Sequence, residues 1–237
     1  MEITKYPKVV KALTGWRAFP RSRKELVASI RLLTSLRTAG WHDSLLDQFR
    51  FDPDTAMPLL TYGAIGFMDA YLTDSSTVLE FGSGGSTIWL AARVKHLVSI
   101  EDDKRWAELI PRFENTQLQL VTCGGDWYDD SPDFSYSRAV SDKASAFPRV
   151  YDAIIVDGKA RTDCAREAIN LLSNHGFIVL DDLHDPLVTP AFQLLSTSGL
   201  KCIEFWGIRP GSGEFGGTAV FLNANNVLDS HGKLLNP

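Results

Sequence analysis

The stretch from residue 78 to residue 87, VLEFGSGGST, constrains the fold more than any other part of the sequence. Residues 77–81 form a short apolar run that begins with two β-branched residues and stops at the first glycine. Such a run is typical of a strand buried in a parallel sheet. The chain is therefore predicted to contain an α/β sheet that is built outward from this strand.

The glycine turn that follows predicts a site for a nucleotide-like ligand. Three glycines fall within residues 82–85, and glycine adopts backbone angles closed to other residues and lets a ligand approach the main chain. Ser86 or Thr87 is expected to cap a helix over residues 88–94. The free N–H groups at that helix start would face the ligand. Glycine is equally common in plain surface turns, so the neighbouring segments decide between the two readings.

Composition is that of an ordinary globular protein. The 237 residues are 44% hydrophobic and 22% charged, with a net charge of -5, which argues against a general nucleic-acid binder. The three cysteines are far apart, so neither a zinc site nor a disulfide framework is indicated. There is no apolar stretch long enough for a signal peptide or a membrane span. We therefore expect a cytoplasmic protein.

The N-terminal arm differs in charge from the rest of the chain. Residues 1–24 carry seven basic side chains and one acidic one, so this arm contributes +6 and the remainder -11 to the net charge of -5. The arm is read as a solvated basic face, with a site for a membrane or an acidic partner as the alternative. Residues 1–74 as a whole are expected to form a basic arm and a helical extension that packs on the sheet or covers the site. Residues 223–237 are expected to form a tail.

Strand-like and helix-like segments alternate through the rest of the chain. Expected strands are residues 77–81, 96–100, 118–122, 151–156, 177–180, 200–206 and 218–222, and expected helices are residues 88–94, 103–110, 160–172 and 187–195. His175 and Gly176 are read as the close of the third of these helices, and residues 123–148 as a lid. The pattern predicts a doubly wound, Rossmann-like sheet that is mostly parallel, with an antiparallel last strand.

Acidic side chains end most of the expected strands. Ligands of a doubly wound sheet bind outside the carboxyl ends of its strands, so these acids should meet at one edge. They are Glu80, Glu101, Asp126, Asp157, Asp181 and Asp182. Glu101 follows Glu80 by 21 residues, near the spacing of about 20 at which an acid binds ribose hydroxyls in dinucleotide folds. The alternative for Glu101 is a helix cap beside its two acidic neighbours.

This order of motifs resembles the class I S-adenosylmethionine-dependent methyltransferases over residues 75–222. The family pattern of acid, any residue, Gly-x-Gly is met by Glu80 to Gly84, with Ser86 where many members have a third glycine. The resemblance implies that Gly82 and Gly84 pass the methionine part of the cofactor, that Glu101 binds its ribose and that Asp126 and Trp127 lie by its adenine. The full implied cofactor set is Glu80, Gly82, Ser83, Gly84, Ser86, Glu101, Asp102, Asp126, Trp127 and Asp157.

A narrower resemblance concerns magnesium. Small-molecule O-methyltransferases of the catechol and macrolide-sugar types hold magnesium with an Asp after strand four and an acidic pair after strand five. Asp157, Asp181 and Asp182 match these positions, and oxygen ligands suit a hard divalent cation that lowers the pKa of substrate hydroxyls. The alternative is that these acids hold strand-end turns by accepting backbone hydrogen bonds.

The catalytic base is less well specified by this resemblance. The catechol enzymes carry a lysine three residues past their first Asp, whereas here Lys159 is two past it and Ala160 takes the third place. Lys159, Arg161 and His184 are therefore candidates, and Asp157 is included among the catalytic residues.

The predicted function is S-adenosylmethionine-dependent O-methylation of a small-molecule or sugar-like hydroxyl, with magnesium as a possible second cofactor and no nucleic-acid partner. One alternative is a non-catalytic module that keeps the cofactor pocket without turnover. Another is an NAD-dependent oxidoreductase, whose fingerprint is Gly-x-Gly-x-x-Gly. That reading ranks lower, because Thr87 stands at the third glycine place and no Tyr-x-x-x-Lys pair follows.

Overall fold

The computed structural model describes residues 22–38, 40–47, 51–122, 135–143, 146–212 and 214–223. The chain divides into two compact units, Met1–Asp43 and Ser44–Pro237. The first unit holds α2 (Arg23–Thr38), a helix of 16 residues, none of which is buried. Its apolar side chains Leu26, Ile30 and Leu33 are about half exposed. The short helix α3 (Trp41–Asp47) runs across the boundary between the units.

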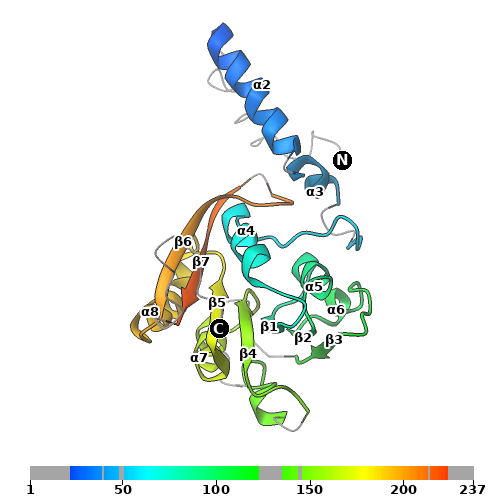
Figure 1. The fold of residues 1–237 in the computed structure, drawn as a ribbon, viewed down its shortest axis with the longest axis vertical. Helices are drawn as coiled ribbons and strands as arrows, with labels where there is room; N and C mark the ends of the chain where they lie inside the picture. Colours follow the sequence, from blue (N-terminus) through cyan, green and yellow to red (C-terminus); the bar gives the residue numbers. More distant parts are fainter. Residues whose placement is uncertain are drawn as a thin grey trace. The chain divides into compact units, whose positions relative to one another are not determined.

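The second unit is built on one sheet of seven strands in the order β3-β2-β1-β4-β5-β7-β6 (Figure 1). Neighbours from β3 to β5 are parallel, while β7 is antiparallel to both β5 and β6. The strands are β1 (Thr77–Phe81), β2 (His96–Glu101), β3 (Thr116–Leu120), β4 (Tyr151–Val156), β5 (Leu172–Leu180), β6 (Lys201–Ile208) and β7 (Phe215–Leu222). The predicted mostly parallel sheet with an antiparallel last strand is confirmed.

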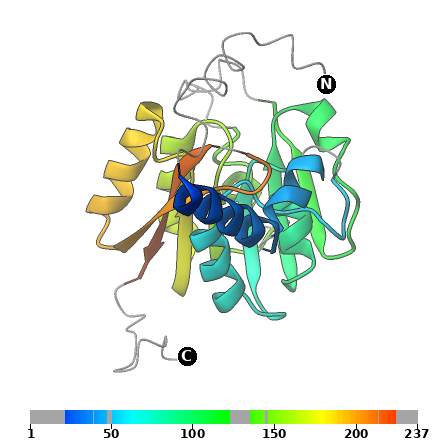
Figure 2. The ribbon, with the colours of Figure 1, turned by 90° about the horizontal axis from the view of Figure 1, so that it is seen from above.

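Helices cover both faces of the sheet because its strands are apolar on both sides. Leu79 and Phe81 of β1 belong to the hydrophobic core that includes α7 (Arg161–Leu171) and α8 (Thr189–Thr197). Val78 belongs to the opposite core, with α4 (Tyr62–Tyr71) and α5 (Gly85–Ala91). Figure 2 shows α8 beside the hairpin of β6 and β7, where Phe192 packs edge-on against Phe221 at 5.6 Å. The alternation also points Glu80 toward α5.

The segment just before β1, which belongs to the second unit, packs on the sheet. Phe67 of α4 makes an edge-to-face contact with Phe177 of β5, with ring centroids 5.3 Å apart. The backbone N–H of Thr61 donates to the Thr218 hydroxyl of β7 at 3.1 Å. Part of the extension expected over residues 1–74 therefore packs on the sheet, and the division between compact units falls after Asp43.

Three expected helix limits are wrong. Helix α5 begins at Gly85, with Gly84 in the N-cap position, so Ser86 and Thr87 lie within the first turn. Both hydroxyls donate to Glu80, and the Thr87 hydroxyl also accepts from the backbone N–H of Gly84 as part of the cap. Helix α6 spans only Lys104–Ala107, although Asp103 caps it as expected. Residues 187–188 lie in a separate 3₁₀ turn before α8.

The glycine pair expected to close α7 lies in a strand. Helix α7 ends at Leu171, and β5 begins at Leu172 and includes His175 and Gly176. A Cβ on Gly176 would lie 2.9 Å from the Asp152 carbonyl oxygen of β4 and 3.0 Å from that of Tyr151. The glycine is therefore required by a close approach of β5 to β4, at the point where their register shifts, and not by a helix end.

The described part of the expected lid belongs to the core. Tyr136 and Val140 are buried, and the Tyr136 hydroxyl donates to the Ile100 carbonyl oxygen at 3.1 Å. Residues 123–134 and 144–145 of the expected lid lie outside the described residues. Across the helices that the structure describes, none combines the length and the apolar character needed to cross a membrane.

Candidate functional site

The glycine turn after β1 is packed tightly against the end of β4. Gly82 has φ +96°, in the range that favours glycine, and a Cβ there would lie 2.9 Å from the backbone nitrogen of Gly158. A Cβ on Gly158 would in turn collide with the Tyr136 hydroxyl. Gly84 differs, since a Cβ there would meet only the Trp106 ring, at 3.8 Å. Both glycines line the cavity described below, but an added Cβ would fit without a clash only at Gly84.

Glu80 supports this turn from beneath. Its carboxyl is fully buried and accepts hydrogen bonds from the hydroxyls of Ser86 at 2.5 Å, Thr87 at 2.7 Å and Ser99 at 2.8 Å. Burial raises the pKa of Glu80 to about 7, although the three hydroxyls act against that rise. Glu80 therefore joins β1, β2 and the first turn of α5 through one carboxyl group.

Glu101 lies on the other side of the turn and is saturated with hydrogen bonds. Its Oε2 accepts from the backbone N–H and the hydroxyl of Ser83 at 2.8 and 2.7 Å. Its Oε1 accepts from the backbone N–H groups of Asp102 and Asp103 at 2.8 and 2.9 Å. Glu101 therefore holds the turn that ends β2, while the following helix α6 is capped by Asp103. The Glu101 carboxylate also lines the cavity described next.

A cavity of about 390 Å³ opens along these strand ends. Its walls are the glycine turn, the segment Glu101–Asp103 with Trp106, the ends of β4 and β5, and residues from the N-terminal side that include Phe51 and Met57. Phe51 and Trp106 meet edge to face with ring centroids 5.1 Å apart, and the Trp106 indole N–H donates to the Ser83 carbonyl. The volume suits a ligand of cofactor size.

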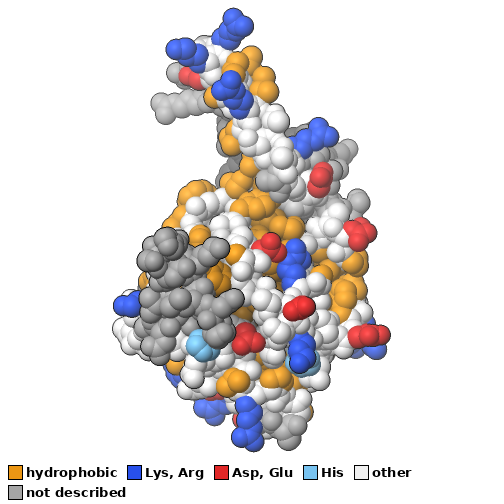
Figure 3. Space-filling view, viewed as in Figure 1, with side chains coloured by type: hydrophobic (Ala, Val, Ile, Leu, Met, Phe, Trp, Pro, Cys, Tyr) orange, Lys and Arg blue, Asp and Glu red, His pale blue; other side chains and the backbone are white. Residues whose placement is uncertain are grey.

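The cavity lies at the point where the strand order reverses. Strand β1 has β2 on one side and β4 on the other, and the crevice at such a switch point is where open α/β sheets bind ligands. On the face of the sheet unit in Figure 3, acidic and basic side chains are interspersed among hydrophobic ones. The cavity itself has both a glycine-rich wall and a wall of charged side chains.

Lys159 and Asp102 form an ion pair at one side of the site. The Lys159 nitrogen is 2.5 Å from Asp102 Oδ2, and the two side chains are only 15% and 10% exposed. The pair links the turn after β4 to the end of β2. The lysine considered as a base is therefore held by a carboxylate.

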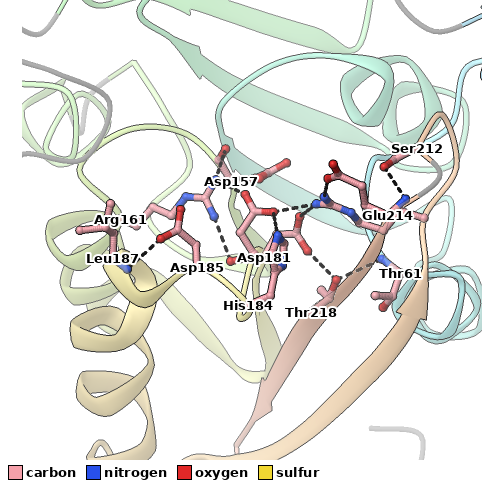
Figure 4. Close-up of polar contacts among 12 residues, drawn as sticks. Thr61, Asp157, Arg161, Asp181, His184, Asp185, Leu187, Ser212, Glu214 and Thr218 are labelled. Atoms are coloured by element: carbon pink, nitrogen blue, oxygen red, sulfur yellow. Dashed lines mark hydrogen bonds and ion pairs between the residues drawn. The ribbon is translucent and has the colours of Figure 1, made fainter. Parts of the chain in front are cut away.

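The acids after β4 and β5 are brought together, as the strand-end argument predicts. Ligand oxygens of Asp157, Asp181 and Asp182 lie within 4.8 Å of one another. Two arginines join these acids. Arg161, which Figure 4 shows extending toward Asp157, reaches Asp157 Oδ1 at 3.1 Å and Asp182 Oδ2 at 2.9 Å. Arg209, which follows β6, donates to Asp182 Oδ1 at 2.7 Å and Asp181 Oδ2 at 3.4 Å.

The three aspartates differ in their proton affinity. Burial and the neighbouring charge of Asp181 raise the pKa of Asp157 well above its usual range. Burial and the charge of Asp182 raise the pKa of Asp181 to about 7, although the Thr218 hydroxyl donates to its Oδ1 at 2.5 Å. Burial acts to raise the pKa of Asp182 too, but Arg161 and Arg209 hold it below its usual value. Asp182 is therefore the carboxylate that keeps its charge most firmly.

The remaining predicted residues are placed as follows. His184 Nε2 lies 3.8 Å from Asp182 Oδ1 at the edge of the acid and arginine network, and the side chain is absent from the described cavity wall. Asp126 and Trp127 lie outside the described residues. Sequence reasoning missed Arg209 and the position of Trp106 on the cavity wall. A basic residue directly after β6, before a glycine-rich turn, was the available signal for Arg209.

No protein-family model matches the sequence, and no curated protein matches it. Solved structures do match. A putative O-methyltransferase from Klebsiella pneumoniae has a TM-score of 0.52 and 17% identity, over 76% of this chain and 90% of that one. A precorrin 8W decarboxylase from Methanobacterium thermoautotrophicum has a TM-score of 0.50 and 17% identity, over 74% of this chain and 96% of that one. At such identities the likeness establishes the fold alone, and it confirms the expected Rossmann-like fold.

Proposed function

We propose that the chain is an S-adenosylmethionine-dependent methyltransferase that acts on a hydroxyl of a small molecule or sugar-like group. The observation that carries the proposal is the cavity at the carboxyl ends of β1 and β2. It is lined by the glycine turn, by the first residues of α5 and by the buried Glu101. The fold alone does not select the chemistry, because one fold hosts many activities.

The residues of the cavity wall fit the cofactor. Gly84 lines the cavity without a side chain, which suits the methionine part, and Trp106 and Phe51 supply aromatic surface. The cofactor supplies a methyl group on a sulfonium cation when it is bound, and nearby carboxylates and aromatic faces favour a cation over neutral competitors. Asp126 and Trp127 stay predictions for the adenine end.

Ribose binding by Glu101 requires one exchange of partners. Both carboxylate oxygens already accept two hydrogen bonds each within the chain. Three of the four donors are backbone N–H groups, whereas the fourth is the Ser83 hydroxyl, which can rotate away without moving the backbone. We therefore assign a ribose hydroxyl to Glu101 Oε2, in place of the Ser83 hydroxyl.

Asp157 is the best-placed acceptor for the substrate proton. Methylation of a hydroxyl releases its proton, so a base at the cavity wall is needed. Asp157 lines the cavity, and no described residue donates to its Oδ2, while Oδ1 holds Arg161. Burial and the charge of Asp181 raise the pKa of Asp157, which makes its carboxylate a stronger proton acceptor. Lys159 is held by Asp102, so we propose Asp157 for the role.

The test is transfer of label from methyl-labelled S-adenosylmethionine to a panel of small hydroxyl compounds, with Asp157→Asn as the paired variant. The proposal expects label in at least one hydroxyl compound with the wild-type protein and a large loss with the variant. Cofactor binding without transfer to any acceptor in the panel or in cell extract would instead support a non-catalytic binding module.

A further inference from the structure

The aspartates after β4 and β5 have the spacing of a divalent-cation site, yet the space between them holds guanidinium groups. We propose that Arg161 and Arg209 are the built-in cations of this site and that Asp157, Asp181 and Asp182 bind no divalent metal. The magnesium expected from the narrower resemblance does not fit these side chains. The proposal concerns the same cavity as the proposed methyl transfer, and it rests on that function only for its consequence that methylation needs no metal.

Arg161 takes the central position of a shared cation. Its Nη2 lies 3.1 Å from Asp157 Oδ1 and 2.9 Å from Asp182 Oδ2, so a single nitrogen bridges two of the three acids. A metal ion that used these two oxygens would have to occupy the same space. Arg161 is the first residue of α7, directly after Ala160, whose φ of 47° turns the chain toward the site.

Arg161 is also firmly anchored. Its Nε donates to the Gly158 carbonyl oxygen at 3.0 Å, and its Nη1 donates to the Asp181 carbonyl oxygen at 2.9 Å. The side chain is 17% exposed. Movement away from the acids would leave these carbonyl groups without their donors in a mostly buried place, which is costly. A metal ion would therefore have to displace a structural clamp.

Arg209 occupies the second pair of oxygens from the opposite side. Its Nη1 lies 2.7 Å from Asp182 Oδ1 and 3.4 Å from Asp181 Oδ2, and its side chain is 12% exposed. Each Asp182 oxygen thus faces a different arginine. The other oxygen of Asp181 accepts from the Thr218 hydroxyl. Asp182 and Asp181 have no oxygen left that is not paired with a described donor.

The charges point the same way. Two guanidinium groups lie within hydrogen-bond distance of three carboxyl groups. The positive charges of the arginines therefore already balance most of the negative charge of the aspartates. Magnesium requires near-octahedral coordination with oxygens at about 2.0–2.1 Å. An ion that close to these oxygens would lie beside two fixed positive charges in a partly buried site, where repulsion is poorly screened.

The test measures manganese binding directly, by electron paramagnetic resonance of free Mn²⁺ and by calorimetry with Mg²⁺, in the full chain without cofactor or acceptor. The wild-type protein is expected to show no saturable binding below about 1 mM. Arg209→Met removes the arginine with fewer backbone anchors and is expected to bind Mn²⁺ at least about tenfold more tightly. Arg209→Gln serves as a second variant if the first does not fold, as judged by its thermal melt. Asp182→Asn added to either variant should abolish the gain.

Arg166→Met is the matched control. Arg166 pairs with Asp163 on α7 and is 52% exposed, so its removal lowers the charge by the same amount without opening the site. It should not gain metal binding. Saturable binding by the wild-type protein that Asp182→Asn removes would overturn the proposal. Absence of any gain in both Arg209 variants would also overturn it, because the arginines would then not be what keeps a cation out. Neither result depends on whether the protein transfers methyl groups.

Discussion

Substitution of Glu80 by glutamine is expected to change how the stability of the protein depends on pH. Glu80 is fully buried, and its pKa is raised from the ordinary value of 4.5 to about 7. The folded protein therefore binds more protons at Glu80 than the unfolded chain does between these two values. The free energy of unfolding must then fall as the pH rises through this interval, and the loss is complete above the folded pKa.

The size of the effect follows from the shift. At about 1.4 kcal/mol for each pKa unit, the interval from 4.5 to about 7 corresponds to a loss of about 3 kcal/mol. Glu80→Gln keeps the shape of the side chain but has no proton to lose, and its amide nitrogen donates hydrogen bonds where a carboxylate oxygen of Glu80 accepts them. Relative to the wild-type protein, the variant should therefore gain up to about 3 kcal/mol between about pH 4.5 and about pH 8.

The assay is urea denaturation followed by circular dichroism at closely spaced pH values, for the wild-type protein and the variant. Asp181, whose pKa is also raised to about 7, titrates in both proteins and cancels in the difference. Ser99→Ala is the control: it keeps the carboxyl group and removes a hydroxyl that lowers its pKa, so the loss of stability should extend to higher pH. Parallel pH profiles for wild type and Glu80→Gln would refute the reasoning.

Three further predictions concern the cofactor and the base. Gly84→Ala should leave the melting temperature unchanged and weaken S-adenosylhomocysteine binding at least about tenfold. Gly82→Ala should instead lower the free energy of unfolding by at least about 1–2 kcal/mol. Equal effects of the two variants on stability would contradict the packing described for the turn. Glu101→Ala should weaken the same binding by about 1.5–3 kcal/mol in calorimetry, and an unchanged affinity would remove Glu101 from the ribose site. Asp157→Asn should keep S-adenosylhomocysteine binding but lose most methyl transfer, and full activity in the variant would assign the base elsewhere.

The sheet could be predicted because its signal is local. Runs such as residues 77–81 and 151–156 are short and apolar, and both form strands at those limits. Helix limits were harder, because the same residues suit two roles. His175 and Gly176 resemble a helix end, but the close approach of β5 to β4 decides that they lie in a strand. Ser86 and Thr87 suit an N-cap position, but the helix begins before them, and both hydroxyls donate to the buried Glu80 while that of Thr87 supports the cap from inside the first turn.

The sequence predicts that the acidic side chains of the candidate site meet at one edge of the sheet. It does not predict the ion pairs that these acids form with arginines and a lysine. Parallel strands bring Asp157 and Asp181 together, so their convergence follows from the topology. The arginines do not follow from it. Arg209 lies 28 residues after Asp181 and reaches it from β6, across the intervening β7, and no local pattern marks such a pair. The pairing of Lys159 with Asp102 likewise depends on contacts between separate strand ends.

The most direct test of the central claim is calorimetric titration of the purified protein with S-adenosylhomocysteine, with NADH as the comparison ligand. The account predicts micromolar binding of S-adenosylhomocysteine, weakened in Gly84→Ala, and no binding of NADH. Absence of S-adenosylhomocysteine binding by the folded wild-type protein would contradict it, because the glycine turn would then be a turn without a cofactor.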